Sequence, residues 1–381
     1  MGLDDLVALR RDLHAHPELG FEEERTSALV AARLEAAGIA VRRFAGTGVV
    51  GTLTRGEGKR IGLRADMDAL AMPETGTPPW ASKNPGRMHA CGHDGHTVML
   101  LGAAEHLARE GGFAGTVHFV FQPAEEGRGG AAAMFADGLL AACPMDAAYG
   151  LHNMPGLDPD QIAVVEGPQL ASSDSWHVTF RGEGTHGAKP HLGRDAVTAA
   201  GHFLAQLSTV TAREVDPLQP AVVSACAMEA GDFDALNVIP DAVRIGGTAR
   251  AYEPGVRDQL EAAIGRLARG VAEGFGIAAD YRFIRRIAPV VNDPGATAAA
   301  RVAAERAGRL VPRFPPSTAG DDFAEFSSRV PGCYVWLGNG PARDGALHHN
   351  GRYDFDDRAI PTGVRYWVEL VREVLAEGAA T

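Results

Sequence analysis

The chain lacks the features that direct proteins out of the cytoplasm or into a bilayer. Its four cysteines are scattered over 381 residues and form no disulfide framework, which favours a reducing compartment. No run of about 18 apolar residues is available to span a membrane, and no Asn-x-Ser/Thr glycosylation site occurs. Charges interrupt the N-terminal segment MGLDDLVALRRDLHAHPELG, so we expect no signal peptide and a cytoplasmic location.

An excess of positive charge is absent as well. The chain has 36 Lys and Arg against 48 Asp and Glu, a net charge of −12, which argues against nucleic acid or an anionic membrane surface as a partner. With 45% hydrophobic and 22% charged residues, the composition is that of a globular protein. The length predicts about two domains.

The first part of the chain alternates between strand-like and helix-like segments. This alternation is typical of an α/β domain with a mostly parallel central sheet and helices on both faces. One short motif, GTGVVG, matches a dinucleotide-binding pattern, but it leads into a strand instead of a helix, so we expect no nucleotide site there. The expected strands are 49–54, 60–66, 116–122 and 146–152, and the expected helices are 3–13, 22–37, 95–109 and 130–137.

The pattern changes after residue 171 and later returns. The middle segments follow the order β-α-β-β-α-β of a ferredoxin-like unit. We therefore predict one domain of residues 1–171 and 288–381, interrupted by an inserted domain of residues 172–287. The inserted strands are expected at 175–182, 220–229, 242–251 and 278–287, with helices at 195–213 and 254–275. After the insertion we expect helices at 295–309, 320–327 and 357–376 and a strand at 333–338.

Side chains that bind metals follow three of the predicted strands. Asp66 and Asp68 follow one, the adjacent Glu125 and Glu126 follow another, and His152 ends a third. In open α/β sheets, sites form beyond the carboxyl ends of the strands. A hydrolytic metal site needs one carboxylate on the ion and another that is free to take a proton from water. The paired glutamates provide such a combination.

Two loops add further candidate ligands. HACGHDGH contains Cys91 and His93, and GALHHNGRYDF contains His348 and His349. Thiolate, imidazole and carboxylate together favour zinc or a neighbouring transition ion over magnesium or calcium. Each group alone also has an ordinary structural explanation, such as a small buried cysteine or a hydrogen-bonded loop histidine, and neither CxxC nor HExxH is present.

Motifs along nearly the whole chain identify a family resemblance. The sequence resembles the amidohydrolase branch of the metallo-aminoacylase and carboxypeptidase clan, which includes hippurate hydrolases, indole-acetyl-amino-acid hydrolases and N-acetyl-diaminopimelate deacetylases. The family has a di-metal catalytic domain with an inserted lid domain, and the lid usually forms the dimer contact. The matching strings include RRDLHAHPELGFEE, GLRADMDAL, GRMHACGHDGHTVMLLGAA, GTVHFVFQPAEEGRGGA, GLHNMP, GEGTHGAKPH, NVIPD, GTAR, GDDFAEF and LHHNGRYDF.

The resemblance implies a cofactor of two divalent metal ions per subunit. Zinc is favoured by the thiolate, with manganese, cobalt or nickel as alternatives. Glu125 would act as general base and acid, and Asp68 would orient a metal ligand. The implied ligands are Cys91 as the bridge between the ions and His93, Glu126, His152 and His349 as terminal ligands.

The inserted lid domain is implied to recognise the substrate. His186 matches a lid histidine that stabilises the developing oxyanion, in its own site or that of a neighbouring subunit. Asn237 and Arg250 match contacts to the carboxylate side of the substrate. We therefore expect a homodimer or higher homo-oligomer, formed through the lid.

The implied reaction is hydrolysis of the amide bond of N-acyl-L-amino acids. A dipeptidase or carboxypeptidase of the same clan is the nearest alternative, although Cys91 favours the deacylating branch. From the residues alone, a thiol hydrolase with Cys91 as nucleophile and a structural zinc protein are further alternatives. The chain departs from relatives at Asp321, where a Glu is usual, and at residues 231–236, which replace a Gly-rich stretch.

Overall fold

The computed structural model describes residues 2–342 and 345–376. It contains two compact units. Unit 1 comprises the residues up to Gly167, Val291–Pro315 and the chain from Asp321 onward, and unit 2 comprises Pro168–Val290 and Pro316–Gly320. Unit 2 thus combines the segment between the two main parts of unit 1 with the short segment 316–320. No helix of the described residues has the length and apolar character needed to cross a membrane.

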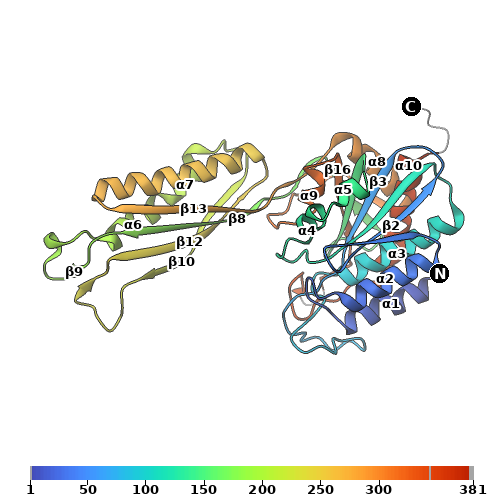
Figure 1. Ribbon diagram of the computed structural model, residues 1–381, viewed down its shortest axis with the longest axis horizontal. Coiled ribbons are helices and arrows are strands. Elements are labelled where there is room, and N and C mark those ends of the chain that lie inside the picture. Colours follow the sequence, from blue (N-terminus) through green and yellow to red (C-terminus); the bar gives the residue numbers. More distant parts are fainter. Residues whose placement is uncertain (1, 343–344, 377–381) are drawn as a thin grey trace. The chain divides into compact units, whose positions relative to one another are not determined.

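An eight-stranded sheet forms the centre of unit 1 (Figure 1). The pairs β3–β4, β3–β5, β5–β16 and β6–β15 are parallel, whereas β1–β2, β2–β4 and β6–β16 are antiparallel. This confirms the prediction of a mostly parallel central sheet. In spatial order the strands are β1 (Ala40–Phe44), β2 (Gly48–Arg55), β4 (Gly115–Gln122), β3 (Arg60–Asp66), β5 (Ala147–Met154), β16 (Gly332–Gly338), β6 (Gln161–Ala163) and β15 (Arg309–Val311).

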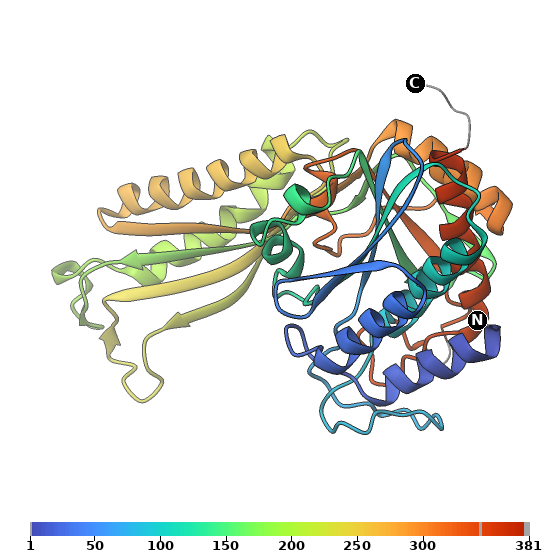
Figure 2. The same cartoon turned by 45° about the vertical axis from the view of Figure 1, so that its right-hand side comes forward.

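Helices cover the sheet of unit 1, and Figures 1 and 2 show α4, α5 and α9 on the other side of the sheet from α1, α2, α3, α8 and α10. The central helix α3 packs on β3, β4 and β5 and contacts α1 and α10. Most of its length is buried, as expected for a helix with apolar residues on all sides. The helices are α1 (Leu3–Ala15), α2 (Glu24–Ala36), α3 (His93–Glu110), α4 (Gly130–Ala136), α5 (Leu139–Ala142), α8 (Pro294–Ala307), α9 (Ala324–Ser327) and α10 (Ile360–Val374).

Unit 2 consists of an antiparallel sheet and two long helices. The strands lie in the order β10-β12-β8-β13, and α6 and α7 both lie on one face of this sheet (Figures 1 and 2). Their buried residues form a separate hydrophobic core around Trp176 and Phe203. In chain order the elements are β8 (Ser173–Arg181), β9 (Thr185–His186), α6 (Ala196–Thr209), β10 (Ala221–Ala230), β11 (Val238–Ile239), β12 (Ala242–Ala251), α7 (Pro254–Phe275) and β13 (Ala278–Ile287).

Local sequence signals explain several element ends. Asp195 caps α6 by accepting hydrogen bonds from the backbone N–H groups of Val197 and Thr198. Gly276 ends α7 in the left-handed conformation that favours glycine. The GTGVVG motif forms the turn before β2 and the start of that strand, and no helix begins there, so the motif leads into a strand as predicted. The remaining short strands, β7 (Gly167–Leu170) and β14 (Val290–Asn292), pair with each other.

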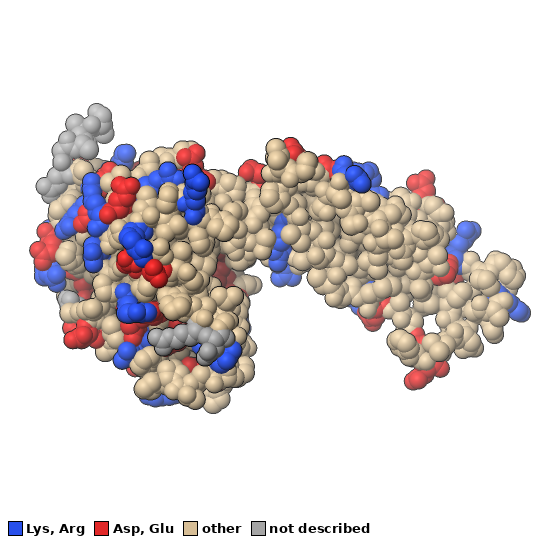
Figure 3. All heavy atoms as spheres, turned by 180° about the vertical axis from the view of Figure 1, so that it is seen from behind, with Lys and Arg blue, Asp and Glu red and all other residues tan. Residues whose placement is uncertain are grey.

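Charged side chains of both signs are interspersed over the face of unit 1 that Figure 3 shows. The face of unit 2 in the same view is mostly uncharged. Mixed charges of this kind do not produce the single-sign field that draws a protein to a polyanion.

Candidate metal centre and active site

The candidate ligands lie where parallel strands of unit 1 end. β3, β4 and β5 are neighbours and run in the same direction, so their carboxyl ends meet at one edge of the sheet. Asp68 follows β3, Glu125 and Glu126 follow β4, and His152 lies near the end of β5. Cys91 precedes α3, which packs across these strands. The fold therefore brings together groups that are far apart in sequence.

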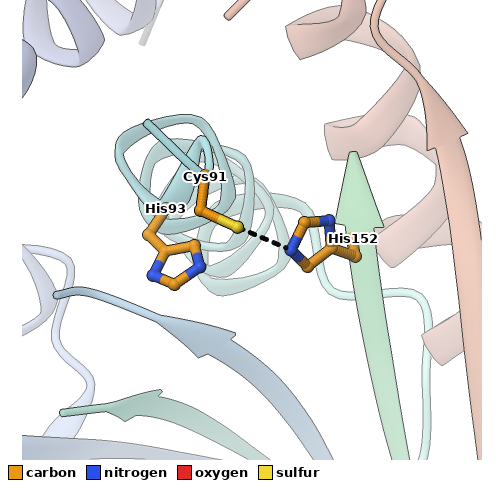
Figure 4. A group of neighbouring side chains, drawn as sticks. All are labelled: Cys91, His93 and His152. Carbon is orange, nitrogen blue, oxygen red and sulfur yellow. Dashed lines mark hydrogen bonds between the residues drawn. The ribbon is translucent and has the colours of Figure 1, made fainter. Parts of the chain in front are cut away.

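Cys91, His93 and His152 form the buried centre of the site. One potential ligand atom from each of them lies within 4.8 Å of the others, and Cys91 Sγ is 3.4 Å from His152 Nε2. Figure 4 shows the sulfur of Cys91 pointing toward the ring of His152 on β5, while the ring of His93, at the start of α3, lies beside Cys91. A thiol and two imidazoles at this separation are a suitable donor set for zinc or a similar ion.

Hydrogen bonds hold both imidazoles with Nε2 available as a ligand. His93 Nδ1 lies 3.2 Å from Asp68 Oδ1, and His152 Nδ1 lies 2.7 Å from the carbonyl oxygen of Asn153. A carboxylate or a carbonyl can only accept, so each Nδ1 carries a proton, and Nε2 presents a lone pair whenever the ring is neutral, as it is when it binds a metal. Metal-binding histidines are typically oriented by such partners.

Cys91 also belongs to a second group with Glu126 and His349. The ligand atoms of these three residues lie within 4.8 Å of one another, and His349 Nε2 is 3.2 Å from Glu126 Oε1. His349 has a left-handed backbone with φ of 61°, and its N–H donates to the carbonyl of Ala90 at 2.8 Å. This conformation is uncommon outside glycine and turns the imidazole toward the glutamate.

Two buried atoms in these groups show that the residues fit a metal. Neither His93 Nε2 nor Glu126 Oε1 makes a hydrogen bond of good geometry among the described residues. The contact of Glu126 Oε1 with His349 Nε2 is an ion pair, and the oxygen lies 3.9 Å from His93 Nε2. Unsatisfied buried polar atoms are costly and call for an explanation. A divalent cation would satisfy both atoms, so the donor set accommodates the ions that the sequence implies.

Glu125 lies beside the second group but outside both groups that contain Cys91. It is 8% exposed, and a carboxylate oxygen lies within 4.8 Å of ligand atoms of His93 and Glu126. Burial, followed by repulsion from Asp321 and Glu126, raises the pKa of the Glu125 carboxyl well above its usual range. This direction opposes the lowering that nearby cations would cause, as a general base that works near neutral pH requires.

Burial also sets the protonation of the histidine and the thiol at the centre. It lowers the pKa of His152 well below its usual value, with a further contribution from His96, so the imidazole is neutral. It raises the pKa of the Cys91 thiol, with Glu126 contributing next. Because coordination to a divalent cation deprotonates a thiol outright, an ion would reverse the state of Cys91.

Asp66, His93 and His96 form a third group of potential ligands. However, Asp66 Oδ1 is 2.6 Å from His96 Nδ1, and Asp66 Oδ2 accepts from Arg64 Nη1 at 2.6 Å. His96 Nε2 in turn accepts the backbone N–H of Asn153 at 3.0 Å. Asp66 and His96 are therefore already engaged in hydrogen bonds. They support the structure around the site and do not offer free ligand atoms.

His348, the neighbour of His349, has a different environment. Its Nε2 lies 2.9 Å from Asn153 Oδ1, and burial, with His96 and His349 nearby, lowers the pKa of the imidazole to about 3. It is therefore neutral and hydrogen-bonded, whereas His349 faces Glu126. The two adjacent histidines therefore have different environments.

The predicted recognition residues lie in unit 2. His186 in β9 pairs with Val238 in β11, and the N–H of Gly187 donates to the carbonyl of Asn237 at 2.7 Å, so His186 and Asn237 are neighbours. His186 is exposed, and its Nδ1 accepts the N–H of Ala188 at 3.0 Å. The neutral ring therefore carries its proton on Nε2, available to a ligand.

Arg250 lies at the end of β12. Its Nη1 contacts the carbonyl of Ala249 at 2.9 Å and the hydroxyl of Thr248, which leaves other guanidinium N–H groups for a ligand.

Sequence reasoning did not identify several residues that shape the site. Arg64, Gln122 and Asp322 are all buried. An arginine in the middle of a strand is usually predicted to be solvated, and two of the three acidic partners of Arg64, Asp321 and Asp322, lie more than 250 residues away in sequence. The available signal was the pair of acidic residues Asp321 and Asp322 in GDDF, at the start of the helix expected at 320–327.

The site combines a thiol, imidazoles and a carboxylate with a buried glutamate, Glu125, that lies outside both ligand groups of Cys91. This arrangement defines a candidate hydrolytic metal centre. The chain belongs to peptidase family M20/M25/M40, whose family model matches residues 62–373. It is 37% identical over 374 residues to an N-acetylcysteine deacetylase of Bacillus subtilis (strain 168), with 97% of each chain covered. It is 39% identical over 374 residues to the hippurate hydrolase of Campylobacter jejuni, with 96% of each covered.

A solved structure agrees with these relationships. A Bacillus subtilis protein described as a dinuclear metal-binding peptidase of the M20 family superposes with a TM-score of 0.86 at 34% identity, with 98% of each chain covered. The family resemblance inferred from the motifs is therefore confirmed, and the chain is a hydrolase of the amidohydrolase type.

Proposed function

We propose that this enzyme hydrolyses the amide bond of N-acyl-L-amino acids, releasing a carboxylic acid and a free amino acid. The observation that carries the proposal is the position of Cys91, which belongs to both groups of potential ligands. A single thiolate shared by two donor sets is suited to two neighbouring cations. Two relatives of nearly full-length similarity are named for the removal of acyl groups from amino acids, which supports this substrate class.

Two divalent ions fit the five candidate ligands. Zinc suits the thiol and imidazole donors best, and manganese, cobalt or nickel are alternatives. When bound, such ions supply Lewis acidity and lower the pKa of water. The proposed ligands are Cys91, His93, Glu126, His152 and His349, with Asp68 orienting His93.

The protein's own groups then move the proton. Glu125 takes a proton from the attacking water and returns it to the nitrogen of the leaving amine as the C–N bond breaks. The hydroxyl of the water ends on the carboxylic acid and the proton on the amine. Its burial keeps bulk solvent away from this transfer. The raised pKa of Glu125 favours both taking the proton and holding it until the amine departs.

Unit 2 is proposed to act as a ferredoxin-like lid that recognises the substrate. His186 would donate a hydrogen bond from Nε2–H to the carbonyl oxygen of the substrate as negative charge develops on that oxygen. Asn237 and Arg250 would hold the carboxylate of the amino acid, for which a guanidinium is well matched. The edge strand β10 is largely exposed along its ten residues. Among the described residues no strand pairs with the outer edge of β10, and a free edge of this length supports the proposal of a homodimer or higher homo-oligomer formed through the lid. We also propose a cytoplasmic location, from the scattered cysteines of the sequence.

The activity can be tested on protein that has been stripped with a chelator and reloaded with zinc or manganese. N-acetyl, N-benzoyl and indole-acetyl amino acids should be hydrolysed faster than plain dipeptides. Glu125→Gln should lower kcat by roughly 10²–10⁴-fold, the range for a general acid–base group, and should keep both ions. Glu110→Gln, on the exposed surface of α3, is the matched control and should leave the rate unchanged.

Each competing function predicts a different outcome of this experiment. Preferential cleavage of dipeptides would instead indicate the peptidase alternative. Full activity after removal of the metal would support a Cys91 nucleophile. Unchanged turnover in Glu125→Gln would exclude Glu125 as the base and favour a structural metal site.

A further inference from the structure

Arg64 is a fully buried cation that contacts both walls of the site. From β3 its Nε donates to Gln122 Oε1 at 2.8 Å, and its Nη1 donates to Asp66 Oδ2 at 2.6 Å. Its Nη2 donates to Asp322 Oδ1 at 3.0 Å and lies 3.2 Å from Asp321 Oδ1. One planar guanidinium thus holds three carboxylates and an amide, an arrangement that needs the fixed fork of donors of arginine.

Asp322 joins the two ends of the loop that carries the paired glutamates. Its Oδ1 accepts from Gln122 Nε2 at 2.7 Å, and its Oδ2 accepts from the backbone N–H of Ala131 at 2.9 Å. Gln122 is the last residue of β4 and Ala131 lies in the first turn of α4, so Glu125 and Glu126 lie on the loop between these two anchor points. Asp322 closes this loop at its base.

The other side of Arg64 leads to the imidazole wall. Asp66 accepts from His96 Nδ1, and His96 Nε2 accepts the backbone N–H of Asn153. The Asn153 side chain donates to the carbonyl of Cys91 at 2.6 Å. This chain of buried hydrogen bonds connects the guanidinium to the backbone beside the central thiol.

We propose that Arg64 is a positioning residue which, through Asp322, fixes the loop of Glu125 and Glu126 relative to the wall that carries Cys91. The inference rests on the proposed function, in which Glu125 transfers the proton. Arg64 touches neither substrate nor reacting atoms in this scheme. Its contribution is to hold the general base in place, and displacement by about 1 Å is enough to slow a reaction by roughly 10²-fold.

Two variants test this role. Arg64→Lys keeps the charge but loses the planar fork, and Asp322→Asn keeps the shape but replaces one of its two acceptor oxygens with a donor. Each should lower kcat by about 10²-fold at saturating metal while KM changes less than about threefold, because positioning affects the transfer step more than binding. Ile61→Ala is the control, since Ile61 is fully buried at the opposite end of β3.

Hydrogen–deuterium exchange of the peptide covering residues 123–131 gives a readout that does not depend on activity. Without added metal, both variants should exchange faster in this peptide than wild type, whereas Ile61→Ala should lower the melting temperature without this local effect. Unchanged exchange in the loop, or a kcat no lower than that of Ile61→Ala, would overturn the inference. If wild-type protein failed to hydrolyse N-acyl amino acids, the proposed function would fail, and the exchange experiment would still decide whether Arg64 fixes the loop.

Discussion

At the scale of single residues, Asp68 connects the two halves of the candidate metal centre. Its Oδ1 faces His93 Nδ1 at 3.2 Å, and its Oδ2 accepts the backbone N–H of Glu126 at 2.9 Å. Each oxygen of Asp68 therefore binds a group of one proposed ligand, the ring of His93 or the backbone of Glu126. This one side chain therefore orients two of the proposed ligands.

Replacement of Asp68 by asparagine should weaken metal binding. The asparagine side chain keeps one acceptor oxygen, and its NH2 group replaces the other. Either His93 Nδ1–H or the N–H of Glu126 then faces a donor, and that residue loses its orientation. We expect the affinity to fall by about 10–100-fold, the usual effect of losing such a partner, measured by competition with a chelator. Asp137→Asn is the control, because Asp137 also accepts a backbone N–H, that of Ala45, at 2.8 Å. Equal affinities in the two variants would contradict the assigned role.

The ligand candidates could be predicted from sequence because each follows a strand or lies in a Gly-broken loop. Their partners could not, because pairing of buried charges depends on tertiary contacts. Arg64 and Asp322 are 258 residues apart and meet only in the folded chain. His348 and His349 are adjacent and chemically identical, so only the folded chain shows that Asn153 faces the first and Glu126 faces the second.

At the scale of elements, the turn between β4 and α4 is under tight steric constraint. A Cβ at Gly130 would lie 1.6 Å from the carbonyl oxygen of Pro123. Gly130→Ala must therefore displace the loop that carries Glu125, at a cost of about 1–3 kcal/mol.

This variant should melt earlier and lose most of its hydrolytic rate. Gly201→Ala in α6 is a control of opposite sign, since a Cβ there meets no atom within 4 Å and alanine stabilises a helix by about 0.5–1 kcal/mol. Thermal unfolding followed by circular dichroism measures both. A Gly130→Ala protein with normal stability and rate would show that the turn is less constrained than the structure indicates.

Most long elements could be predicted from periodicity, whereas several short ones could not. The expected strand 60–66 and helix 254–275 coincide with β3 and α7. By contrast, β1 contains two arginines at the edge of the sheet and shows no apolar alternation. β15 was not expected, and its first residue, Arg309, was placed at the end of the helix expected at 295–309. Strands of two or three residues are too short to show a period, and the pairing partner defines them.

At the scale of the whole molecule, each unit has a hydrophobic core of its own. All five proposed metal ligands lie in unit 1, whereas the proposed recognition residues lie in unit 2. Metal binding and catalysis should therefore respond differently when unit 2 is destabilised.

Trp176→Ala tests this separation. Trp176 is fully buried in the core of unit 2, and its truncation should cost about 3–5 kcal/mol. As unit 2 unfolds on heating, hydrolysis should stop while two ions stay bound, measured as metal content after gel filtration. Leu101→Ala, in α3 of unit 1, is the matched variant. Its protein should release the ions when unit 1 unfolds. Loss of metal together with the unfolding of unit 2 would contradict the assignment of the ligands.

The central claim is that one sulfur holds two cations beside an uncoordinated carboxylate. Anomalous diffraction from crystals loaded with zinc tests it most directly. We expect two anomalous peaks, each about 2.3 Å from Cys91 Sγ, the usual zinc–sulfur distance, with no bond from either ion to Glu125. A single peak, peaks remote from Cys91, or an ion bonded to Glu125 would contradict the account.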